Sequence, residues 1–190
     1  MNPLISAASL LIHLFFDAYI FILLLRFILQ KLNVSWYNPV SRFIITVTQK
    51  PLIPFRKIIP RRDGYDFAIL VFALIVQLIE NCFLWWIQSG ALPHGVGLIL
   101  IVVSQVLGKF ITIYTYAIIV NAISSWIPTM QMNPLSQIIS LLVDPLLSVF
   151  RRYIPLIAGI DISPIFALVG LTLINMVIVT PLLMEGMKLM

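Results

Sequence analysis

The chain has 190 residues, of which 61% are hydrophobic and only 10% are charged, with a formal net charge of +5 at pH 7. Soluble domains carry roughly a quarter charged residues, so this balance, with a mean hydropathy of +1.08, excludes an ordinary soluble protein and predicts an integral membrane protein. The lone cysteine, Cys82, excludes an intrachain disulfide and four-cysteine metal or redox sites.

Four stretches are long enough to cross a bilayer, which takes about 20 mostly apolar residues. They cover approximately residues 4–29, 67–87, 96–123 and 165–184. The first lacks the basic region and cleavage site of a signal peptide, so we interpret it as a true membrane helix. We expect Arg26, near its far end, to extend its side chain to the headgroups. Trp36 and Tyr37 follow as an interfacial belt.

The segment 38–66 predicts a helix that lies along the membrane surface. Asn38 suits an N-cap, and Pro39 suits the first helical position because its missing N–H would have no helical partner there. The next apolar residues recur at i, i+3, i+4 and i+7 and form one stripe: Val40, Phe43, Ile44 and Val47. A short amphipathic helix of this kind is better suited to the interface than to crossing.

The second half of this segment is rich in proline and charge. Pro51, Pro54 and Pro60 are expected to divide it into turns and at most a two-turn helix. That short helix would carry the basic pair Arg56-Lys57. Asp66 is predicted to cap the span that follows.

Residues 133–161 repeat this segment at an offset of 95 positions. The matched positions include Asn38/Asn133, Pro39/Pro134, Ser41/Ser136, Arg56/Arg151, Lys57/Arg152, Pro60/Pro155, Gly64/Gly159 and Asp66/Asp161. Its apolar stripe is Leu135, Ile138, Ile139 and Leu142, and Asn133 and Asp161 take the same predicted capping roles. The sequence therefore predicts two repeats, 1–94 and 95–190, each a span, an amphipathic segment and a span.

Basic residues predict the orientation. Those between the first two spans are Lys31, Arg42, Lys50, Arg56, Lys57, Arg61 and Arg62, those between the last two are Arg151 and Arg152, and the middle turn has none. The positive-inside rule then places both long loops in the cytoplasm and both termini outside. The repeats are parallel, whereas inverted repeats would most directly suggest alternating-access transport, although parallel repeats also occur in transporters.

The twin boxes NPxS…P…[RK][RK]…P…GxD, each between two hydrophobic spans, resemble the YggT family of small bacterial membrane proteins, which has relatives in chloroplasts. The resemblance covers nearly the whole chain. It implies a polytopic inner-membrane protein without catalytic residues, of a kind linked to osmotic-stress tolerance or ion uptake, to cell division and to assembly of membrane complexes. One departure is Asp144-Pro145 in the second box, where the first reads Gln49-Lys50-Pro51.

The basic pairs Arg56-Lys57 and Arg151-Arg152 are the first candidate site. In one interpretation they fix topology and attract anionic lipid headgroups, at about 1 kcal/mol per basic residue near the surface. In the other they form, side by side, a docking surface for a membrane-protein partner. Nucleic acid is not an expected partner, because the charge lies beside the bilayer without a recognition motif.

The second candidate is a set of ionisable residues inside the spans: His13, Asp17, Glu80 and Lys109. At about 1.5 Å per residue, Asp17 and Lys109 lie roughly 20 Å from the outer ends of their helices, and His13 and Glu80 roughly 13 Å. An Asp17–Lys109 ion pair is therefore allowed, with Glu80 near His13.

This set has two readings. In the first, its members only make interhelical contacts, worth about 0.6 kcal/mol each. In the second, they form a cation or proton path. Metal or haem ligation is not expected, because the only other histidine, His94, lies in the outer turn. The repeat offset places Gly108, Thr112 and Asn175 opposite His13, Asp17 and Glu80, so the acidic cluster is not duplicated.

The sequence thus predicts an all-α integral membrane protein with four transmembrane helices in two parallel repeats, each holding a cytoplasmic interfacial helix. It has no nucleophile elbow, phosphate-binding loop or cysteine pair, so neither an enzyme nor a cofactor is expected. The favoured function is an inner-membrane organising or assembly factor that engages lipid headgroups and a membrane-protein partner, and such a small bundle also allows homo-oligomers. The alternative is a transport-related role in ion homeostasis through Asp17, Glu80 and Lys109.

Overall fold

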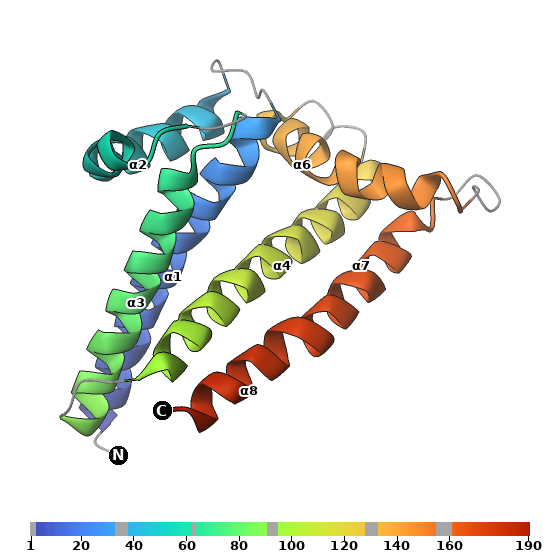
Figure 1. Ribbon diagram of the computed structural model, residues 1–190. Coiled ribbons are helices and arrows are strands. Elements are labelled where there is room, and N and C mark those ends of the chain that lie inside the picture. Colours follow the sequence, from blue (N-terminus) through green and yellow to red (C-terminus); the bar gives the residue numbers. More distant parts are fainter. Residues whose placement is uncertain (1–2, 33–37, 62–63, 91–94, 128–132, 155–160) are drawn as a thin grey trace.

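The computed structural model describes residues 3–32, 38–61, 64–90, 95–127, 133–154 and 161–190. Across these ranges the chain forms helices and no strand (Figure 1), so the predicted all-helical class is confirmed. Several residues of the sequence predictions lie outside the described residues: Trp36, Tyr37, Arg62, His94, Pro155, Gly159 and the side chain of Lys31.

The helices come in two kinds. The long ones are α1 (Pro3–Lys31), α3 (Phe67–Ser89), α4 (Val96–Trp126) and a composite of α7 (Ser163–Ile174), the π-turn η1 (Asn175–Val179) and α8 (Thr180–Lys188). The lateral ones are α2 (Pro39–Ile58) and α6 (Pro134–Arg151). Figure 1 shows α2 and α6 lying across the same end of the long helices, while α1 begins and α8 ends at the opposite end. Each half of the chain thus has the order long, lateral, long.

Five helices are long and apolar enough to cross a membrane by length and composition alone. They are Pro3–Gln30, Phe67–Ser89, Val96–Trp126, Pro134–Arg151 and Ser163–Lys188. All four spans expected from the sequence are among them. The fifth is α6, the shortest and least apolar of the set, which the sequence placed in the interface.

The prediction that Pro51 and Pro54 break the first lateral segment is wrong, although the helix does end at Ile58, shortly before Pro60. α2 is one helix that passes through both Pro51 and Pro54, and α6 likewise passes through Pro145. An interior proline costs a helix about 3 kcal/mol. Tertiary packing offsets this cost, because Leu52, between the two prolines, is fully buried in the core.

The buried face of α2 is also rotated relative to the expected stripe. It consists of Ser41, Ile44, Thr48 and Leu52, whereas Phe43 is 58% and Val47 is 38% exposed. Thr48 turns inward because it accepts a hydrogen bond from Arg26 of α1. The expected stripe of α6 is split in the same way: Ile138 and Leu142 are buried, but Leu135 is exposed.

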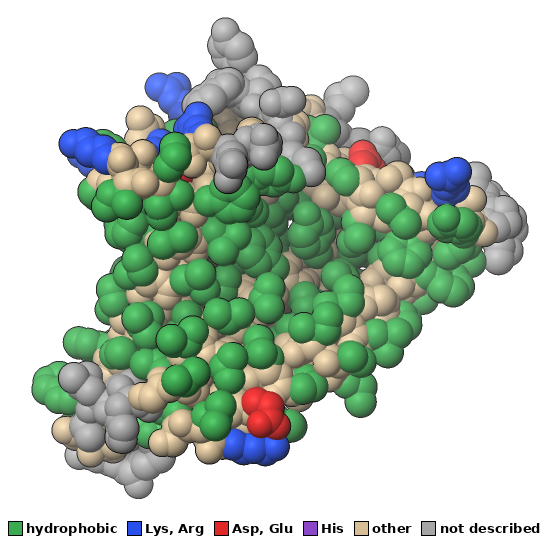
Figure 2. Space-filling model, viewed as in Figure 1, with side chains coloured by type: hydrophobic (Ala, Val, Ile, Leu, Met, Phe, Trp, Pro, Cys, Tyr) green, Lys and Arg blue, Asp and Glu red, His purple; other side chains and the backbone are tan. Residues whose placement is uncertain are grey.

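One hydrophobic core joins the two repeats. Its buried members come from α1, α2, α3, α4, α6 and α7, and include Ile20, Leu24, Leu52, Ile69, Ile118, Val143 and Leu147. The outward faces of the long helices expose large apolar side chains, among them Leu10, Phe15, Ile99 and Met176. Figure 2 shows hydrophobic side chains over these flanks, as expected of surfaces that face lipid.

α4 and α8 cross so closely that only glycine fits on both. A Cβ atom at Gly97 would lie 2.3 Å from the carbonyl oxygen of Gly186, and one at Gly186 would lie 2.8 Å from Cγ1 of Ile101. Such small-residue contacts are typical of packed membrane helices. The crossing fixes the last helix against the first helix of its own repeat.

The last long helix is interrupted directly before Pro181. The π-turn Asn175–Val179 directly precedes α8, in which Pro181 is the second residue. Proline offers no N–H to the turn before it, while the Asn175 carbonyl accepts from both the backbone N–H and, at 3.2 Å, the Oγ1 of Thr180. The interruption therefore takes the form of one widened turn.

Candidate functional site

Each lateral helix is tied to the long helix that follows it by an arginine–aspartate pair. Arg56 Nε donates to Asp66 Oδ2 at 2.7 Å, and the two residues are ten positions apart. The repeated pair, Arg151 Nε to Asp161 Oδ2, has a distance of 2.8 Å and the same spacing. In each repeat, the first residue of the basic pair and the aspartate of the G-x-D motif are thus partners in one ion pair.

This pairing divides the predicted basic pairs into two kinds of residue. Asp66 is fully buried and the Arg56 side chain is only 22% exposed, so Arg56 is an internal tie and not a displayed charge. Lys57 and Arg152 are exposed. The tie was not recognised from the sequence, although both boxes place a G-x-D motif at a constant distance after the basic pair.

The second tie has an additional acidic partner. Arg151 Nη1 also lies 3.4 Å from Asp144 Oδ1, the acid that occurs only in the second box. Burial raises the pKa of Asp161, but hydrogen bonds from Arg151 and Ser163 outweigh burial and leave this pKa below its ordinary value. The hydrogen bond to Asp161 correspondingly raises the pKa of Arg151. Both groups therefore stay charged at neutral pH.

Polar contacts also join each lateral helix to the long helix before it. Arg26 Nη1 donates to Thr48 Oγ1 at 2.5 Å and to the Ile45 carbonyl at 3.3 Å, so this buried arginine does not extend to the headgroups as expected. α2 lies over the end of α1 and supplies the oxygen atoms that water or lipid would otherwise supply. In the second repeat, Ser140 Oγ donates to Asn121 Oδ1 at 2.9 Å.

The first residue of each box, Asn38 or Asn133, is the N-cap of its lateral helix, and Asn38 also contacts the start of the second box. Asn38 Oδ1 accepts from Val40 N at 2.9 Å and Asn133 Oδ1 accepts from Leu135 N at 3.0 Å. Asn38 Nδ2 also donates to the Pro134 carbonyl at 2.8 Å, which joins the two repeats.

The two aspartates differ as caps. Asp66 occupies the N-cap position of α3 but makes no side-chain cap hydrogen bond, because its carboxylate faces the arginine. Asp161 both binds its arginine and accepts from Ser163 N at 2.9 Å. The N-cap residue of α7 is Ile162, which makes no side-chain cap hydrogen bond, and Asp161 lies one position before it. Neither aspartate therefore makes the N-cap hydrogen bond that the sequence predicted.

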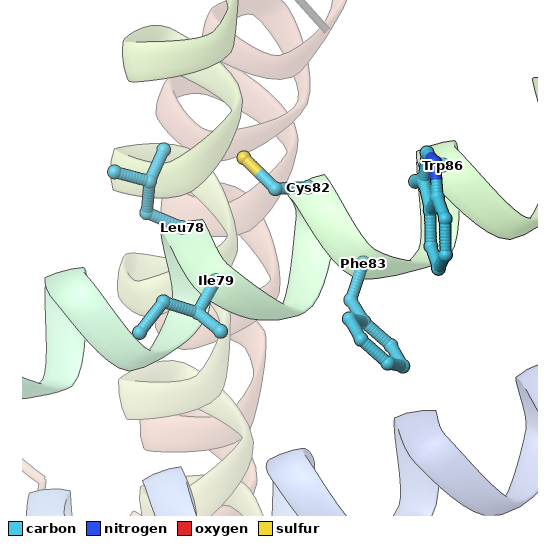
Figure 3. A pocket seen from close by; sticks show the side chains of 5 residues that line it. All are labelled: Leu78, Ile79, Cys82, Phe83 and Trp86. Atoms are coloured by element: carbon cyan, nitrogen blue, oxygen red, sulfur yellow. The ribbon is translucent and has the colours of Figure 1, made fainter. Parts of the chain in front are cut away.

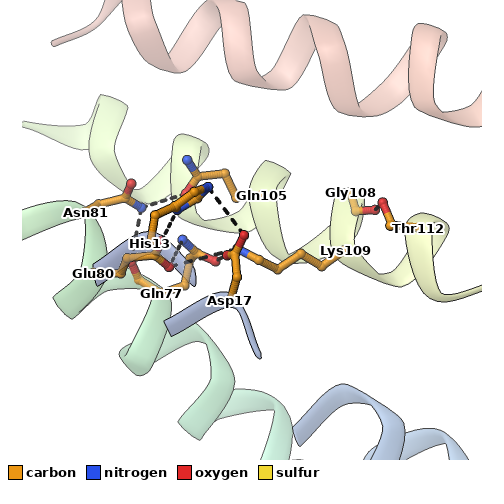
Figure 4. A network of polar contacts seen from close by, with 9 residues as sticks. All are labelled: His13, Asp17, Gln77, Glu80, Asn81, Gln105, Gly108, Lys109 and Thr112. Atoms are coloured by element: carbon orange, nitrogen blue, oxygen red, sulfur yellow. Dashed lines mark hydrogen bonds and ion pairs between the residues drawn. The ribbon is translucent and has the colours of Figure 1, made fainter. Parts of the chain in front are cut away.

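The intramembrane residues singled out in the sequence form one cluster between α1, α3 and α4 (Figure 4). Lys109 Nζ lies 2.6 Å from Asp17 Oδ1 and 4.0 Å from Glu80 Oε2. His13 Nδ1 contacts Glu80 Oε1, and His13 Nε2 lies 3.3 Å from Asp17 Oδ2. The structure therefore contains both contacts that the helix depths allow.

Amide side chains complete the cluster, and these were not placed in it from the sequence. Gln77 Nε2 donates to Glu80 Oε2 at 2.9 Å, and the side-chain Oε1 of Gln77 accepts from Lys109. Asn81 Nδ2 donates to Gln105 Oε1 at 2.6 Å. The signal was their helical spacing, since Gln77 and Asn81 flank Glu80 on one face.

The second repeat has no equivalent cluster at the matching positions. Gly108 and Thr112 take the places of His13 and Asp17, and Thr112 Oγ1 donates to the Gly108 carbonyl at 3.0 Å within its own helix. Figure 4 shows both residues further along α4, apart from the cluster. Among the described residues, the polar contacts found in both halves are the arginine–aspartate ties, the Asn caps and the contact of each lateral helix with the long helix before it.

His13, Asp17 and Glu80 each bring one ligand atom to within 4.8 Å of the others, a spacing that a metal ion can bridge. The Lys109 ammonium, however, contacts the same carboxylates and supplies their positive charge. The donor set thus fits an internal ion-pair network better than a metal centre.

α3 also carries an apolar pocket of about 260 Å³ on its outward face. Its lining residues, Leu78, Ile79, Cys82, Phe83 and Trp86, all come from this one helix (Figure 3). None of its five lining residues belongs to the polar cluster. Its shape and chemistry suit an acyl chain or an apolar side chain.

The fold and these contacts define an all-helical membrane protein built from two tandem repeats, in which lateral helices are tied back to the long ones. The chain belongs to the CCB3/YggT family, whose sequence profile matches residues 5–87 and again residues 100–182. The two matches are displaced by the same 95 positions as the boxes, so the resemblance drawn from the sequence is confirmed.

Relatives align along nearly the whole chain. An uncharacterised protein of Pseudomonas aeruginosa is 36% identical over 98% of this chain and 96% of its own length. The uncharacterised protein YggT of Escherichia coli K12 is 34% identical over 93% of this chain and 89% of its own. A chloroplastic YlmG homolog of Arabidopsis thaliana is 39% identical over 35% of this chain and 26% of its own. No solved structure matches the chain.

Proposed function

We propose that this chain is a non-catalytic organising or assembly factor of the bacterial inner membrane. The four long helices cross the bilayer, α2 and α6 lie along its cytoplasmic surface, and both termini are periplasmic. Positive charge supports this orientation. Exposed basic residues of the lateral helices and their flanks are Arg42, Lys50, Lys57, Arg61, Arg151 and Arg152, and Figure 2 shows Lys and Arg side chains along this end.

Equal repeats support an interfacial position for α6. If α6 crossed the membrane, the second repeat would cross three times and the first only twice. The two chain ends would then lie on opposite sides, whereas α1 begins and α8 ends at one end of the molecule. Four crossings keep both halves equivalent.

The observation that carries the proposal is the duplicated lateral helix with one arginine tied and the next basic residue exposed. Lys57 and Arg152 stand at equivalent positions, and both are exposed beside exposed apolar residues, such as Ile58 on α2 and Val149 on α6. Apolar side chains that enter the membrane next to basic ones at headgroup level are typical of interfacial helices. We therefore assign to this face anionic lipid headgroups and a membrane-protein partner.

The test replaces the exposed basic residues and spares the ties. Lys57→Gln combined with Arg152→Gln should lower crosslinking to co-purified proteins in native membranes several-fold and reduce thermal stabilisation by anionic lipid, because two headgroup-level charges are lost. The control, Glu185→Gln with Lys188→Gln, changes an exposed pair at the opposite end and should alter neither. Unchanged crosslinks and unchanged lipid dependence in the first double variant would contradict the proposal.

A second candidate, a transport-related role in ion homeostasis, is favoured by the cluster itself, since ionisable side chains at bilayer depth mark ion or proton pathways. In proteoliposomes this function requires a cation or proton flux, and Asp17→Asn should reduce the flux at least about tenfold, because Asp17 is the more exposed carboxylate of the cluster. Liposomes with intact protein that pass neither cations nor protons would remove this candidate.

A further inference from the structure

Both ring nitrogens of His13 face a carboxylate. Nδ1 contacts Glu80 Oε1, and Nε2 lies 3.3 Å from Asp17 Oδ2. A neutral imidazole has a single N–H, so its other nitrogen would turn a lone pair toward a carboxylate oxygen. One additional proton, on the ring or on a carboxyl group, makes both contacts attractive.

The balance of charges in the cluster also requires one additional proton. The charged groups that the three packed helices bring together are Asp17 on α1, Glu80 on α3 and Lys109 on α4. With a neutral His13 they sum to one negative charge, and one further proton makes the cluster neutral. An uncompensated charge at bilayer depth is costly, and Gln77, which donates one hydrogen bond to Glu80, supplies no charge.

We propose that His13, Asp17 and Glu80 form a binding site for one exchangeable proton, with Lys109 as the fixed counter-charge. The His13 side chain is 57% exposed and the Glu80 side chain 1%, so the histidine is the more accessible side of the site and the glutamate the buried one. The site does not depend on either function proposed above.

The site links the two repeats. α1 and α3 belong to the first repeat, and Lys109 belongs to the first helix of the second. Release of the proton turns the contact between His13 and one carboxylate from attractive to repulsive. The packing of α1 against α3 and α4 thereby becomes dependent on pH.

The experiment observes the proton directly. The chain has two histidines, so a His94→Gln variant labelled with ¹⁵N-histidine and placed in nanodiscs reports His13 alone by NMR. A proton held on the ring gives a signal from two protonated ring nitrogens at pH 7. Glu80→Gln in the same background should lose at least about half of that imidazolium signal, because one of the two carboxylates that stabilise it is gone.

Infrared spectroscopy covers the other location of the proton. A neutral His13 ring together with one protonated carboxyl band that disappears in Glu80→Gln or Asp17→Asn also supports the site. If Glu80→Gln does not fold, Asp17→Asn makes the same comparison on the more exposed side of the cluster. Glu185→Gln, which removes an exposed carboxyl of α8, should change neither spectrum.

Two results would overturn the proposal. One is a neutral His13 ring at pH 7 in folded protein without any protonated carboxyl band. The other is an imidazolium signal that is the same size with and without the carboxylates of Glu80 and Asp17. Both are read from the intact protein's spectra, so they are independent of any flux or crosslinking result.

Discussion

Gly97→Ala should destabilise the purified protein by about 3 kcal/mol or more, at the upper end of overpacking costs. The added methyl group would lie 2.3 Å from the Gly186 carbonyl oxygen and 2.9 Å from backbone atoms of Leu189 and Met190. Backbone atoms cannot move aside by a rotamer change, so α4 and α8 would have to separate. Thermal unfolding in detergent, followed through a thiol-reactive dye on half-buried Cys82, measures this loss.

Gly108→Ala is the matched control on the same helix. Its new methyl group would lie 3.5 Å from Cγ1 of Val179, an ordinary contact, and alanine favours a helix over glycine by about 1 kcal/mol. This variant should be neutral or slightly more stable than the parent chain. Equal midpoints for both variants would show that the close crossing of α4 and α8 does not hold the second repeat together.

The second large effect is expected from Lys109→Met. The substitution keeps the length and apolar stem of the side chain but leaves Asp17 and Glu80 without their fixed positive charge. Removal of one partner from a buried ion pair costs about 3–5 kcal/mol, because the remaining charge is uncompensated. Unfolding in mixed detergent should show a loss of about 3 kcal/mol.

A double variant separates lost charge from lost packing. Lys109→Met with Asp17→Asn removes one charge of each sign, so its stability should exceed that of Lys109→Met alone, a non-additivity expected of residues in contact. Lys188→Met, in an exposed pair with Glu185, should cost less than about 1 kcal/mol. If Lys109→Met were as mild as Lys188→Met, the cluster would not contribute to folding.

Much of the architecture follows from the sequence because two strong signals act together. Long apolar runs and a repeat at a constant offset predict the long helices, the lateral segments and their parallel order without any tertiary information. The continuous α2 was missed because local rules treat Pro51 and Pro54 as breaks. The packing of Leu52 into the core, which overrides them, is a tertiary contact.

The candidate site was predicted unevenly for a similar reason. Helix periodicity and depth place Asp17 near Lys109 and Glu80 near His13, since all four residues lie on regular helices. The ties of Arg56 to Asp66 and of Arg151 to Asp161 were missed, because each aspartate lies ten positions away, beyond the end of the arginine's helix, where helix periodicity relates no residues. Buried Arg26 was misassigned because its partner Thr48 belongs to another helix.

The two repeats share their ties and caps but differ in the polar cluster, and this difference bears on how a duplicated chain can be built. A half-length ancestor could have built this bundle only as a pair of identical chains, and every contact would then have occurred twice. Position 14, the counterpart of Lys109, is a leucine, so such a pair made from the first repeat would have held four carboxylates and no lysine in its interior. In a single chain the two halves are free to differ, and here the carboxylates lie in the first repeat and the ammonium in the second. The lateral helices with their ties are thus common to both halves, whereas the polar cluster among the long helices is asymmetric.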